Sequence, residues 1–385
     1  MTTLDSFLEK AGAALQSAES RKRLSHRIGR YIRNFLRILT VLYAGSLILL
    51  PVLATWIGER NITLAFLLYL PRAIILVPLP FLFIGTLPFS WRLALVQLAA
   101  GGFFFTYGMG YEWRRSTHQH FDGTHGPPQL TVLTCNYGQN ANQSLQPFKN
   151  RIKPDILALQ ETAGRAKRYL ADPNYSEFKD GRSIGEHTFL SRYPIISGEL
   201  VDLGGDIHDH TPAARFVIDF EGREVVVYSV HFLTVRDALT HYRKGSFLYG
   251  ILGIVPGTSF HRKKASYESM WQDRIRTAEA FKEIIDRETL PTIVLGDFNA
   301  PAGGYIQRIL SEGLQDTHQS AGSGSGYTFP GTTRNPLSAG GPWMRIDYIL
   351  ANRHWDVTAS VTEEKRPGQH RAVAAKVSLA HTPGP

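Results

Sequence analysis

The chain has 385 residues, of which 43% are hydrophobic, and a formal net charge of +9 at neutral pH. This length exceeds one average domain and supports a sizeable core. The charge is unevenly placed: residues 1–37 hold eight basic and three acidic residues, whereas residues 121–385 hold 29 and 28. The basic balance therefore does not indicate that the C-terminal part binds nucleic acid, and the single cysteine, Cys135, excludes an intrachain disulfide.

Residues 1–34 are basic, and Leu4, Phe7, Leu8 and Leu15 recur at helical spacing. Their apolar continuation begins too late and runs too long for a cleavable signal peptide. Next to a hydrophobic segment, the expected partner of such a cluster is an anionic lipid headgroup. We therefore predict a basic cytoplasmic segment over residues 1–34.

Residues 35–115 are predicted to be a transmembrane region of about three spans. The spans are expected at 35–57, within 62–88 and at 92–110. Pro71 and Arg72 interrupt the second, so either Arg72 extends to the interface from a kinked span, or the span is about 73–88 with 62–71 at the interface.

The basic N-terminus predicts a multi-pass protein of the plasma (inner) membrane with a cytoplasmic start. Three spans would then place residues 121–385 on the extracytoplasmic side, and two spans would reverse this. We favour the extracytoplasmic side, because the N-terminal basic cluster is larger than the Arg114-Arg115 pair after the last span.

A linker over 116–128 precedes a predicted domain over 129–380, in which strands outnumber helices. Strands are expected at 130–136, 155–161, 189–201, 214–220, 225–232, 292–297, 327–329, 345–351, 357–361 and 372–379, with helices at 144–152 and 266–287. Apolar strand runs of this kind favour a sheet that is covered on both faces. The domain contains no internal repeat that would indicate a solenoid.

Polar side chains recur at the ends of these predicted strands. They are Asn136, Glu161, His231, Asp297, Asn299, Asp347 and His370. Any one of them fits a cap or a turn. Seven that each adjoin an apolar strand favour a common site, because strand ends converge in packed α/β sheets.

The ordered motifs TCNYG, ALQET, YSVHFLT, VLGDFNA, RIDYIL and QHRAVAAKV resemble the endonuclease/exonuclease/phosphatase superfamily. The resemblance covers about residues 128–380 and depends on the order and spacing of the motifs. It implies a DNase I-like α/β (α+β) four-layer β-sandwich flanked by helices, with a divalent metal, Mg²⁺ or Mn²⁺. The membrane-anchored layout also resembles the glycopeptide-resistance branch, which is thought to act on undecaprenyl pyrophosphate.

The resemblance implies a metal site at Glu161, supported by Asn136 and Gln369. Glu161 is the kind of hard oxygen ligand that Mg²⁺ prefers. At Gln369 the family usually has Asp, so this chain supplies a neutral carbonyl in place of a carboxylate. We expect weaker metal binding or an altered metal preference, and a catalytically weakened binding module is an alternative.

The resemblance also implies roles in proton transfer and phosphate binding. Asp347 matches the carboxylate that orients His370, and either His370 or Asp297 is the base that activates water. Asn299 matches a donor to a phosphate oxygen, and His231 matches a histidine that binds the phosphoryl group or protonates the leaving oxygen. Arg215 and Arg274 fall where the family often has Arg, and either phosphate binding or a structural role fits them.

Two segments outside this pattern stand out. Residues 245–256 form an apolar loop between basic groups, suited either to the membrane interface or to covering the core. Asp206, His208, Asp209 and His210 form a cluster that we interpret as a polar loop or, alternatively, a second metal site.

The predicted function is that of a membrane-anchored, metal-dependent phosphohydrolase. In-line attack of water would cleave a phosphoester or pyrophosphate bond, with a lipid-linked phosphate as the favoured substrate and the lipid bilayer as partner. A membrane-tethered nuclease acting on DNA is the alternative. Nothing in the sequence indicates an obligate protein partner.

Overall fold

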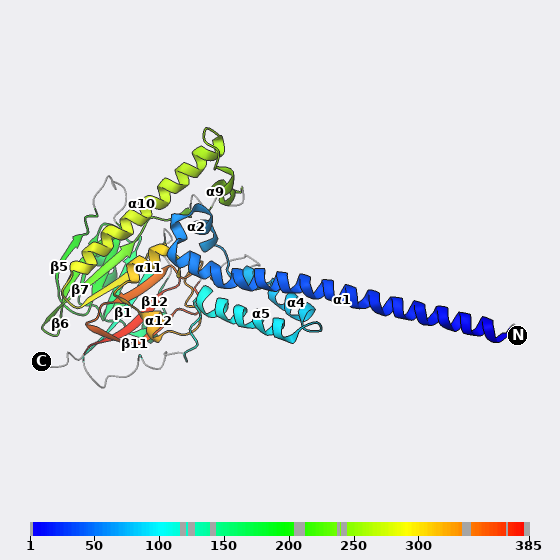
Figure 1. Cartoon of the computed structure of the whole chain (residues 1–385). Coiled ribbons are helices and arrows are strands. Elements are labelled where there is room, and N and C mark those ends of the chain that lie inside the picture. The colour runs from blue at the N-terminus through cyan, green and yellow to red at the C-terminus, as the bar shows by residue number, and fades with distance from the viewer. Residues whose placement is uncertain are drawn as a thin grey trace, which may run out of the picture. The chain divides into compact units, whose positions relative to one another are not determined.

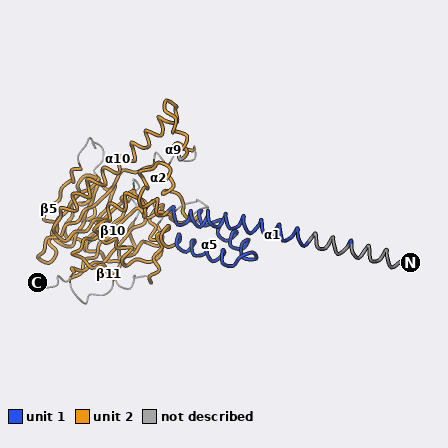
Figure 2. The backbone as a smooth tube through the Cα atoms, viewed as in Figure 1, with its two compact units in different colours: residues 1–50, 74–105 blue, residues 51–73, 106–385 orange. Residues whose placement is uncertain are grey.

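The computed structural model describes residues 3–115, 121, 128–138, 144–203, 212–236, 239, 245–332, 340–366 and 369–380. The chain forms two compact units (Figures 1 and 2). Unit 1 comprises residues 1–50 and 74–105, and unit 2 comprises 51–73 and 106–385. The cluster at Asp206–His210 and most of the linker lie outside the described residues.

Unit 1 is helical. It contains most of α1 (Thr3–Trp56), the greater part of α3 (Ala73–Leu76), α4 (Pro78–Thr86) and α5 (Trp91–Phe103), and η2 (Phe104–Gly108) follows α5. Buried Gln97 donates through Nε2 to the hydroxyls of Thr40 and Thr86, at 2.8 and 3.1 Å. These bonds join α1, α4 and α5 in the way polar side chains join apolar helices.

Only one helix among the described residues is long and apolar enough to cross a membrane, at Lys22–Trp56. Ile62–Leu68 and Ala73–Thr86 reach that length only together, and they are bent by 91°. The helix of the expected third span, α5, has 13 residues. Among the described residues, the prediction of about three spans is thus reduced to one helix of sufficient length and one bent helix pair.

The segment from Pro51 to Ala73 belongs to the same compact unit as the C-terminal domain, which differs from the boundary expected near residue 115. Here η1 (Gly58–Arg60) and α2 (Ile62–Leu68) place Phe66 in a buried cluster with Trp271 and Met344. Arg72 donates to the carbonyls of Gly108 and Ala302 at 2.6 Å. Its guanidinium therefore bonds within the unit and does not extend to an interface.

Two six-stranded mixed sheets form the body of unit 2, in the orders β11-β12-β1-β2-β4-β3 and β5-β6-β7-β8-β10-β9. The first contains β1 (Gln129–Asn136), β2 (Ile156–Gln160), β3 (Asp180–Ile184), β4 (His187–Ser191), β11 (Trp355–Thr362) and β12 (Val373–Leu379). The second contains β5 (Ile195–Leu200), β6 (Ala213–Phe220), β7 (Arg223–His231), β8 (Thr292–Asp297), β9 (Gln315–Asp316) and β10 (Asp347–Ala351).

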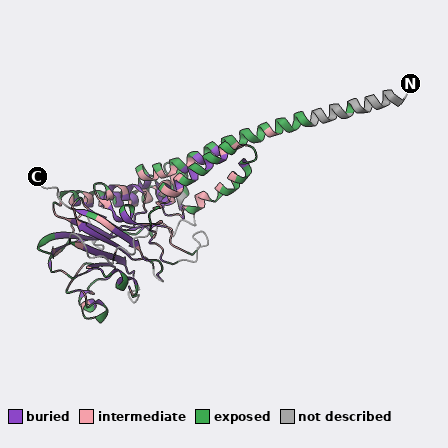
Figure 3. Ribbon diagram, turned by 90° about the horizontal axis from the view of Figure 1, so that it is seen from below, coloured by how far each residue is buried: buried purple, intermediate pink, exposed green. Residues whose placement is uncertain are grey.

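The sheets pack face to face, and helices cover their outer faces (Figure 1). The central core joins side chains of both sheets, such as Phe189 and Phe216, whose rings stack 4.3 Å apart. Outside the first sheet lie α6 (Phe148–Ile152), α7 (Ala166–Leu170) and η4 (Pro173–Tyr175). Outside the second lie α10 (Ser259–Arg287) and α11 (Tyr305–Ser311). The strands are largely buried, as Figure 3 shows, and the expected α/β sandwich is present.

Several elements differ from the expectation. The strand predicted at 189–201 is split between β4 and β5, in different sheets, because Pro194 cannot donate to a ladder. Residues 327–329 form only an isolated bridge, between Phe329 and Met344. Short α12 (Thr317–Ala321), η6 (Ser246–Leu248) and α9 (Tyr249–Leu252) were not expected as separate elements.

Gly296 allows β7 and β8 to approach closely just before Asp297. Its φ is +135°, and a Cβ there would lie 2.1 Å from the carbonyl oxygen of Val230. We predict that Gly296→Ala lowers the free energy of unfolding by about 3 kcal/mol or more, because backbone must move. Gly222→Ala is the control, since its φ is +83° and a Cβ would meet nothing within 4 Å. Equal losses in chemical unfolding of the two variants would contradict the prediction.

We predict that the fold loses stability in acid, because His318 is buried without a proton. Burial, and then the charge of Arg345, lowers the pKa of His318 to about 4, so between pH 6.5 and 4 the unfolded state binds the extra proton. Stability therefore falls as pH falls through this window, by roughly 2–3 kcal/mol between pH 7 and 4.5. We expect His318→Gln to lose less stability over that interval than the parent chain when unfolding is measured at both pH values; an identical loss would refute the assignment.

Candidate active site

Four strand ends meet at one edge of the sandwich. Strand β1 ends at Asn136, and β2 ends immediately before Glu161; β7 ends at His231 and β8 at Asp297. Because β1 is parallel to β2 and β7 to β8, the carboxyl ends of each pair lie side by side. A 2.9 Å hydrogen bond from Asn136 Nδ2 to Asp297 Oδ2 joins the two sheets at this edge.

Asp347 and His370 reach the same place from antiparallel strands. Asp347 begins β10, directly opposite Asp297 in the register. His370 lies just before β12, and its Nδ1 is 3.0 Å from Asp347 Oδ2. Because a carboxylate only accepts, Nδ1–H donates to Asp347, which leaves Nε2 facing Asp297 Oδ2 at 3.6 Å.

Asp297 is fully buried at the centre of the cluster. Its carboxylate accepts three hydrogen bonds: from Asn136 Nδ2 at 2.9 Å, from the Asn299 backbone N–H at 2.8 Å and from Asn299 Nδ2 at 3.1 Å. A buried carboxylate is stable only with such donors in place of water. The network therefore fixes the position of Asp297.

The charge of His370 depends on its carboxylate neighbours. Burial opposes the imidazolium, but Asp347 and Asp297 outweigh burial and raise the pKa of His370 to about 9. The ring is thus protonated at neutral pH in the metal-free chain. A nearby cation would lower this pKa and allow the ring to accept a proton.

Glu186 is a residue of the site that the sequence argument missed. His231 Nδ1 lies 2.9 Å from Glu186 Oε1, so that the pair repeats the arrangement of His370 and Asp347. Burial lowers the pKa of His231, whereas Glu186, Asp297 and Glu161 together raise it above its usual value. Glu186 lies in the two-residue turn between β3 and β4, next to Gly185. In the sequence, the Gly185-Glu186 pair has the form of a two-residue hairpin turn, and this pattern could have placed Glu186 at the tip of a hairpin.

Glu161 and Asn299 follow their strands in left-handed backbone conformations, with φ of 56° and 48°. Such conformations are uncommon for residues other than Gly and cluster at functional sites. The Glu161 carboxylate approaches His231 Nε2 at 3.8 Å and is partly exposed. Asn299 Nδ2 donates to the Phe232 carbonyl at 2.8 Å as well as to Asp297, so its amide holds Asp297 in this structure.

Among the described residues, the Gln369 side chain makes no hydrogen bond or ion pair to the cluster. This side chain is exposed, and its Oε1 accepts a 3.1 Å hydrogen bond from Arg236 Nη2. The side-chain oxygen of Asn136 in turn accepts from the Gly138 backbone N–H at 2.8 Å. Of the three expected metal-site residues, Glu161 therefore has the oxygens least engaged by protein donors.

The two arginines suggested for phosphate binding both donate to protein oxygens. Arg215 donates to Glu288 at 2.8 Å and faces Glu199 at 3.5 Å, apart from the cluster. Arg274 is buried and donates to the Asn299 carbonyl at 2.8 Å. Tyr69 donates its hydroxyl to the same carbonyl at 2.7 Å, so the segment after α1 supports the loop that carries Asp297 and Asn299.

The donor set fits a hard divalent cation. Ligand atoms of Asp297, Asp347 and His370 lie within 4.8 Å of one another. The cluster has more carboxylates than imidazoles and is therefore rich in negative charge. Its two imidazoles adjoin the carboxylates of Glu161, Glu186, Asp297 and Asp347. Asp297 and Asp347 are already engaged by N–H donors. Glu161 is left as the partly exposed oxygen ligand of the kind Mg²⁺ prefers.

A comparison with known families agrees with this arrangement. The sequence profile of the endonuclease/exonuclease/phosphatase family matches residues 137–368, more than half of the chain. The chain belongs to this family. Members of the family are hydrolases acting on phosphoester bonds, and they generally use divalent metals.

Solved structures similar to the chain include two family proteins. The one from Bacteroides thetaiotaomicron has 16% identity and a TM-score of 0.45, over 66% of this chain and 100% of that chain. The one from Leptotrichia buccalis has 17% identity and a TM-score of 0.44, over 65% and 100%. The 3′ phosphatase NExo from Neisseria, bound to a product DNA hairpin, has 17% identity and a TM-score of 0.41, over 64% and 98%. A comparison with curated proteins found no match.

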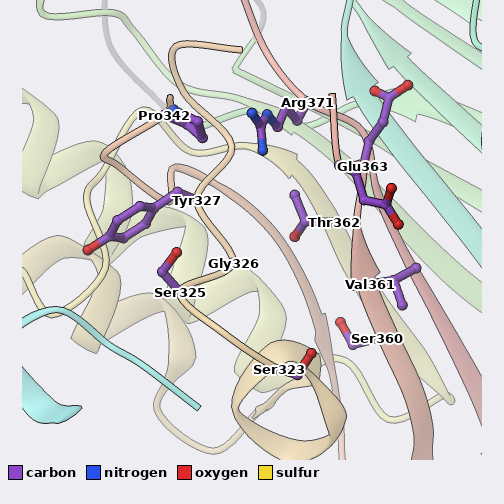
Figure 4. Close-up of a pocket in the computed structure, with 11 residues that line it drawn as sticks. Ser323, Ser325, Gly326, Tyr327, Pro342, Ser360, Val361, Thr362, Glu363 and Arg371 are labelled. Atoms are coloured by element: carbon purple, nitrogen blue, oxygen red, sulfur yellow. The ribbon is translucent and has the colours of Figure 1, made fainter. Parts of the chain in front are cut away.

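A separate polar pocket of about 360 Å³ lies between β11 and the segment around Gly326 (Figure 4). Tyr327, Glu363 and Arg371 are among the residues that line it. None of the seven residues expected at the site does so. We therefore place the candidate active site at the converging strand ends.

Glu186 provides a test of this arrangement. We predict that Glu186→Ala lowers phosphohydrolase kcat about 10-fold or more, because His231 loses the partner that fixes its ring orientation. Glu186→Gln keeps an acceptor oxygen and should lose less. The measurement is kcat with thermal unfolding of both variants; unchanged turnover in a folded Glu186→Ala protein would exclude the role.

Proposed function

We propose that the chain is a membrane-anchored, divalent-metal-dependent phosphohydrolase that cleaves a phosphoester or pyrophosphate bond of a lipid-linked substrate. The observation that carries this proposal is the joining of two carboxylate–histidine pairs around buried Asp297, with the Glu161 carboxylate beside them. Family membership supplies the reaction class.

In the proposed reaction, water attacks phosphorus in line with the leaving oxygen. Asp297, fixed by its three donors, positions the attacking water. The proton that this water loses passes to His370, held by Asp347, or, where His370 is already protonated, to Asp297. His231 is oriented by Glu186 and donates to the phosphoryl or leaving oxygen. Asn299 reaches a phosphoryl oxygen only if its amide gives up one of its two present acceptors.

Glu161 is the residue proposed to hold Mg²⁺ or Mn²⁺, with Asn136 beside it. When bound, the cation would neutralise charge on the phosphoryl oxygens. Gln369, turned toward Arg236, contributes no carboxylate there. We therefore expect weaker metal binding than an Asp at this position would give.

The proposed anchoring rests on the character of α1. The most apolar 18 residues of its Lys22–Trp56 stretch have a mean hydropathy of 2.1, and only 17% of them are buried. Exposed residues line the described part of α1 in Figure 3. A helix in the core of a soluble protein would bury those side chains. The basic residues before the span favour a plasma-membrane protein with a cytoplasmic N-terminus and an extracytoplasmic catalytic domain, and labelling of a Glu224→Cys variant only after cell lysis would exclude that side.

The substrate class is inferred from this anchoring and from charge. Residues 121–385 are nearly neutral, whereas binding to a DNA backbone depends on clustered basic contacts. An enzyme held at the bilayer meets lipid-linked phosphates at high local concentration. DNA is the second substrate class to be tested, and no obligate protein partner is proposed.

The test uses purified full-length protein with Mg²⁺, Mn²⁺ or a chelator, offered undecaprenyl pyrophosphate, phospholipids and plasmid DNA in parallel. We predict metal-dependent phosphate release from the lipid substrate alone. Nicked plasmid without lipid turnover would favour the nuclease. No turnover of any substrate, unchanged by Gln369→Asp, would favour a binding module.

Glu161→Gln serves as the matched active-site variant in the same assay. It removes a metal-binding charge from a partly exposed position, so we expect kcat to fall about 100-fold or more with a raised metal requirement. Glu224→Gln, on the exposed start of β7, is the control and should be unaffected. A metal titration of Glu161→Gln matching the parent chain would contradict the assignment.

A further inference from the structure

A set of large apolar side chains is exposed on unit 2 where α9 leads into α10. It comprises Leu248, Ile251, Leu252, Ile254, Val255 and Phe260, which we name the apolar tip. Ile254 is 68% exposed and Ile251 is 58% exposed. Figure 1 shows the N-terminal end of α10 extending past the sheets, with α9 beside it. Large exposed apolar side chains concentrated in one short segment favour an interaction site.

The backbone that presents the apolar tip is held in place. Tyr249 is buried and its ring stacks on Tyr267, with ring centres 6.0 Å apart. His261 Nδ1 lies 2.9 Å from the Gly253 carbonyl oxygen, and the Thr258 hydroxyl caps α10 by accepting from the His261 backbone N–H. The chain thus buries one aromatic face and directs the other apolar side chains outward.

The apolar tip adjoins the place where the chain leaves the proposed span. α9 packs on α2 so closely that a Cβ on Gly250 would lie 2.4 Å from Thr63 Oγ1. α2 begins at Ile62, and only five residues separate it from the end of α1 at Trp56. Trp56 itself packs against Arg308 of α11, 4.7 Å from the guanidinium carbon to the ring centre. The apolar tip therefore packs on a helix that follows the proposed span after only a few residues.

Basic side chains flank the apolar tip. Arg262 and Lys263 are exposed near the start of α10, and Lys263 Nζ also lies 5.2 Å from the ring centre of Tyr249. Apolar side chains next to Lys and Arg match the boundary between acyl chains and anionic headgroups. A soluble protein partner would not need to lie beside the span.

We infer that the apolar tip inserts into the interfacial layer of the same bilayer that α1 crosses. This gives unit 2 a second attachment to the membrane besides the span. The inference rests on the membrane anchoring in the proposed function, but not on its chemistry. It commits to a lipid surface, with a second copy of the chain and another protein as outcomes that would exclude it.

The test uses the full chain carrying Ile254→Cys, labelled with an environment-sensitive fluorophore, because the native Cys135 is buried. Glu224→Cys is the control, at the end of the fold where α10 finishes; α10 has 29 residues and is about 43 Å long. Both variants are placed in nanodiscs of phosphatidylcholine and phosphatidylglycerol. Quenching by nitroxide-labelled lipid is compared with quenching by aqueous iodide.

We expect lipid quenching at position 254 to exceed that at 224 at least threefold, with iodide showing the reverse order. Equal iodide access at the two positions would overturn the inference. If protection of position 254 from iodide is lost when each nanodisc holds one chain, the apolar tip contacts a second copy. If the protected label is insensitive to the lipid quencher, the apolar tip contacts another protein surface. Either outcome also overturns the inference.

Flotation of the parent chain with vesicles after an alkaline wash distinguishes a failure of apolar-tip insertion from a failure of membrane anchoring. A chain that floats but whose position 254 stays in water refutes only the insertion of the apolar tip. A chain that does not float refutes the membrane anchoring. In pure phosphatidylcholine, we expect lipid quenching at position 254 to fall, because Arg262 and Lys263 lose their anionic partners; unchanged quenching would exclude the headgroup contribution.

Discussion

A carboxylate with no exposed surface is stable only where donors replace water, and the arrangement around Asp297 follows from this constraint. Its donors come from Asn136 in one sheet and from Asn299 beyond the end of its own strand. The Asn136 bond fixes the two sheets relative to each other at the edge where both parallel pairs end. The His370–Asp347 pair then meets Asp297 from the opposite strand.

Much of this arrangement is readable from the sequence, because strand ends obey simple geometry. Asn136, Glu161, His231 and Asp297 each adjoin an apolar run, and side chains at the carboxyl ends of parallel strands share an edge. The same apolar runs predict a sheet that is covered on both faces, whereas the four-layer arrangement of two sheets is implied only by the family resemblance. Glu186 was missed because its significance depends on a hairpin whose tip reaches a residue 45 positions away.

The sequence did not predict the tertiary contacts of three features: Arg215, Arg274 and the segment from Pro51 to Ala73. An arginine in a family-like position indicates charge, but only tertiary packing shows that Arg215 pairs with Glu288 and that Arg274 holds a backbone carbonyl. Residues 62–71 are apolar enough to resemble a membrane segment. Composition does not distinguish side chains that face lipid from those that face a protein core, as Phe66 and Tyr69 do here.

The contact from Tyr69 to the Asn299 carbonyl bears on how the catalytic unit can be isolated. Glu59 also accepts hydrogen bonds from the first backbone N–H groups of α11, and Trp343 donates to the Tyr69 carbonyl. A soluble fragment that begins at the first strand would leave those groups unpaired and uncover the face on which α2 lies. The smallest self-sufficient catalytic unit therefore includes a piece of chain from before the first strand, and cutting at the apparent domain boundary would damage the site that such a fragment is meant to preserve.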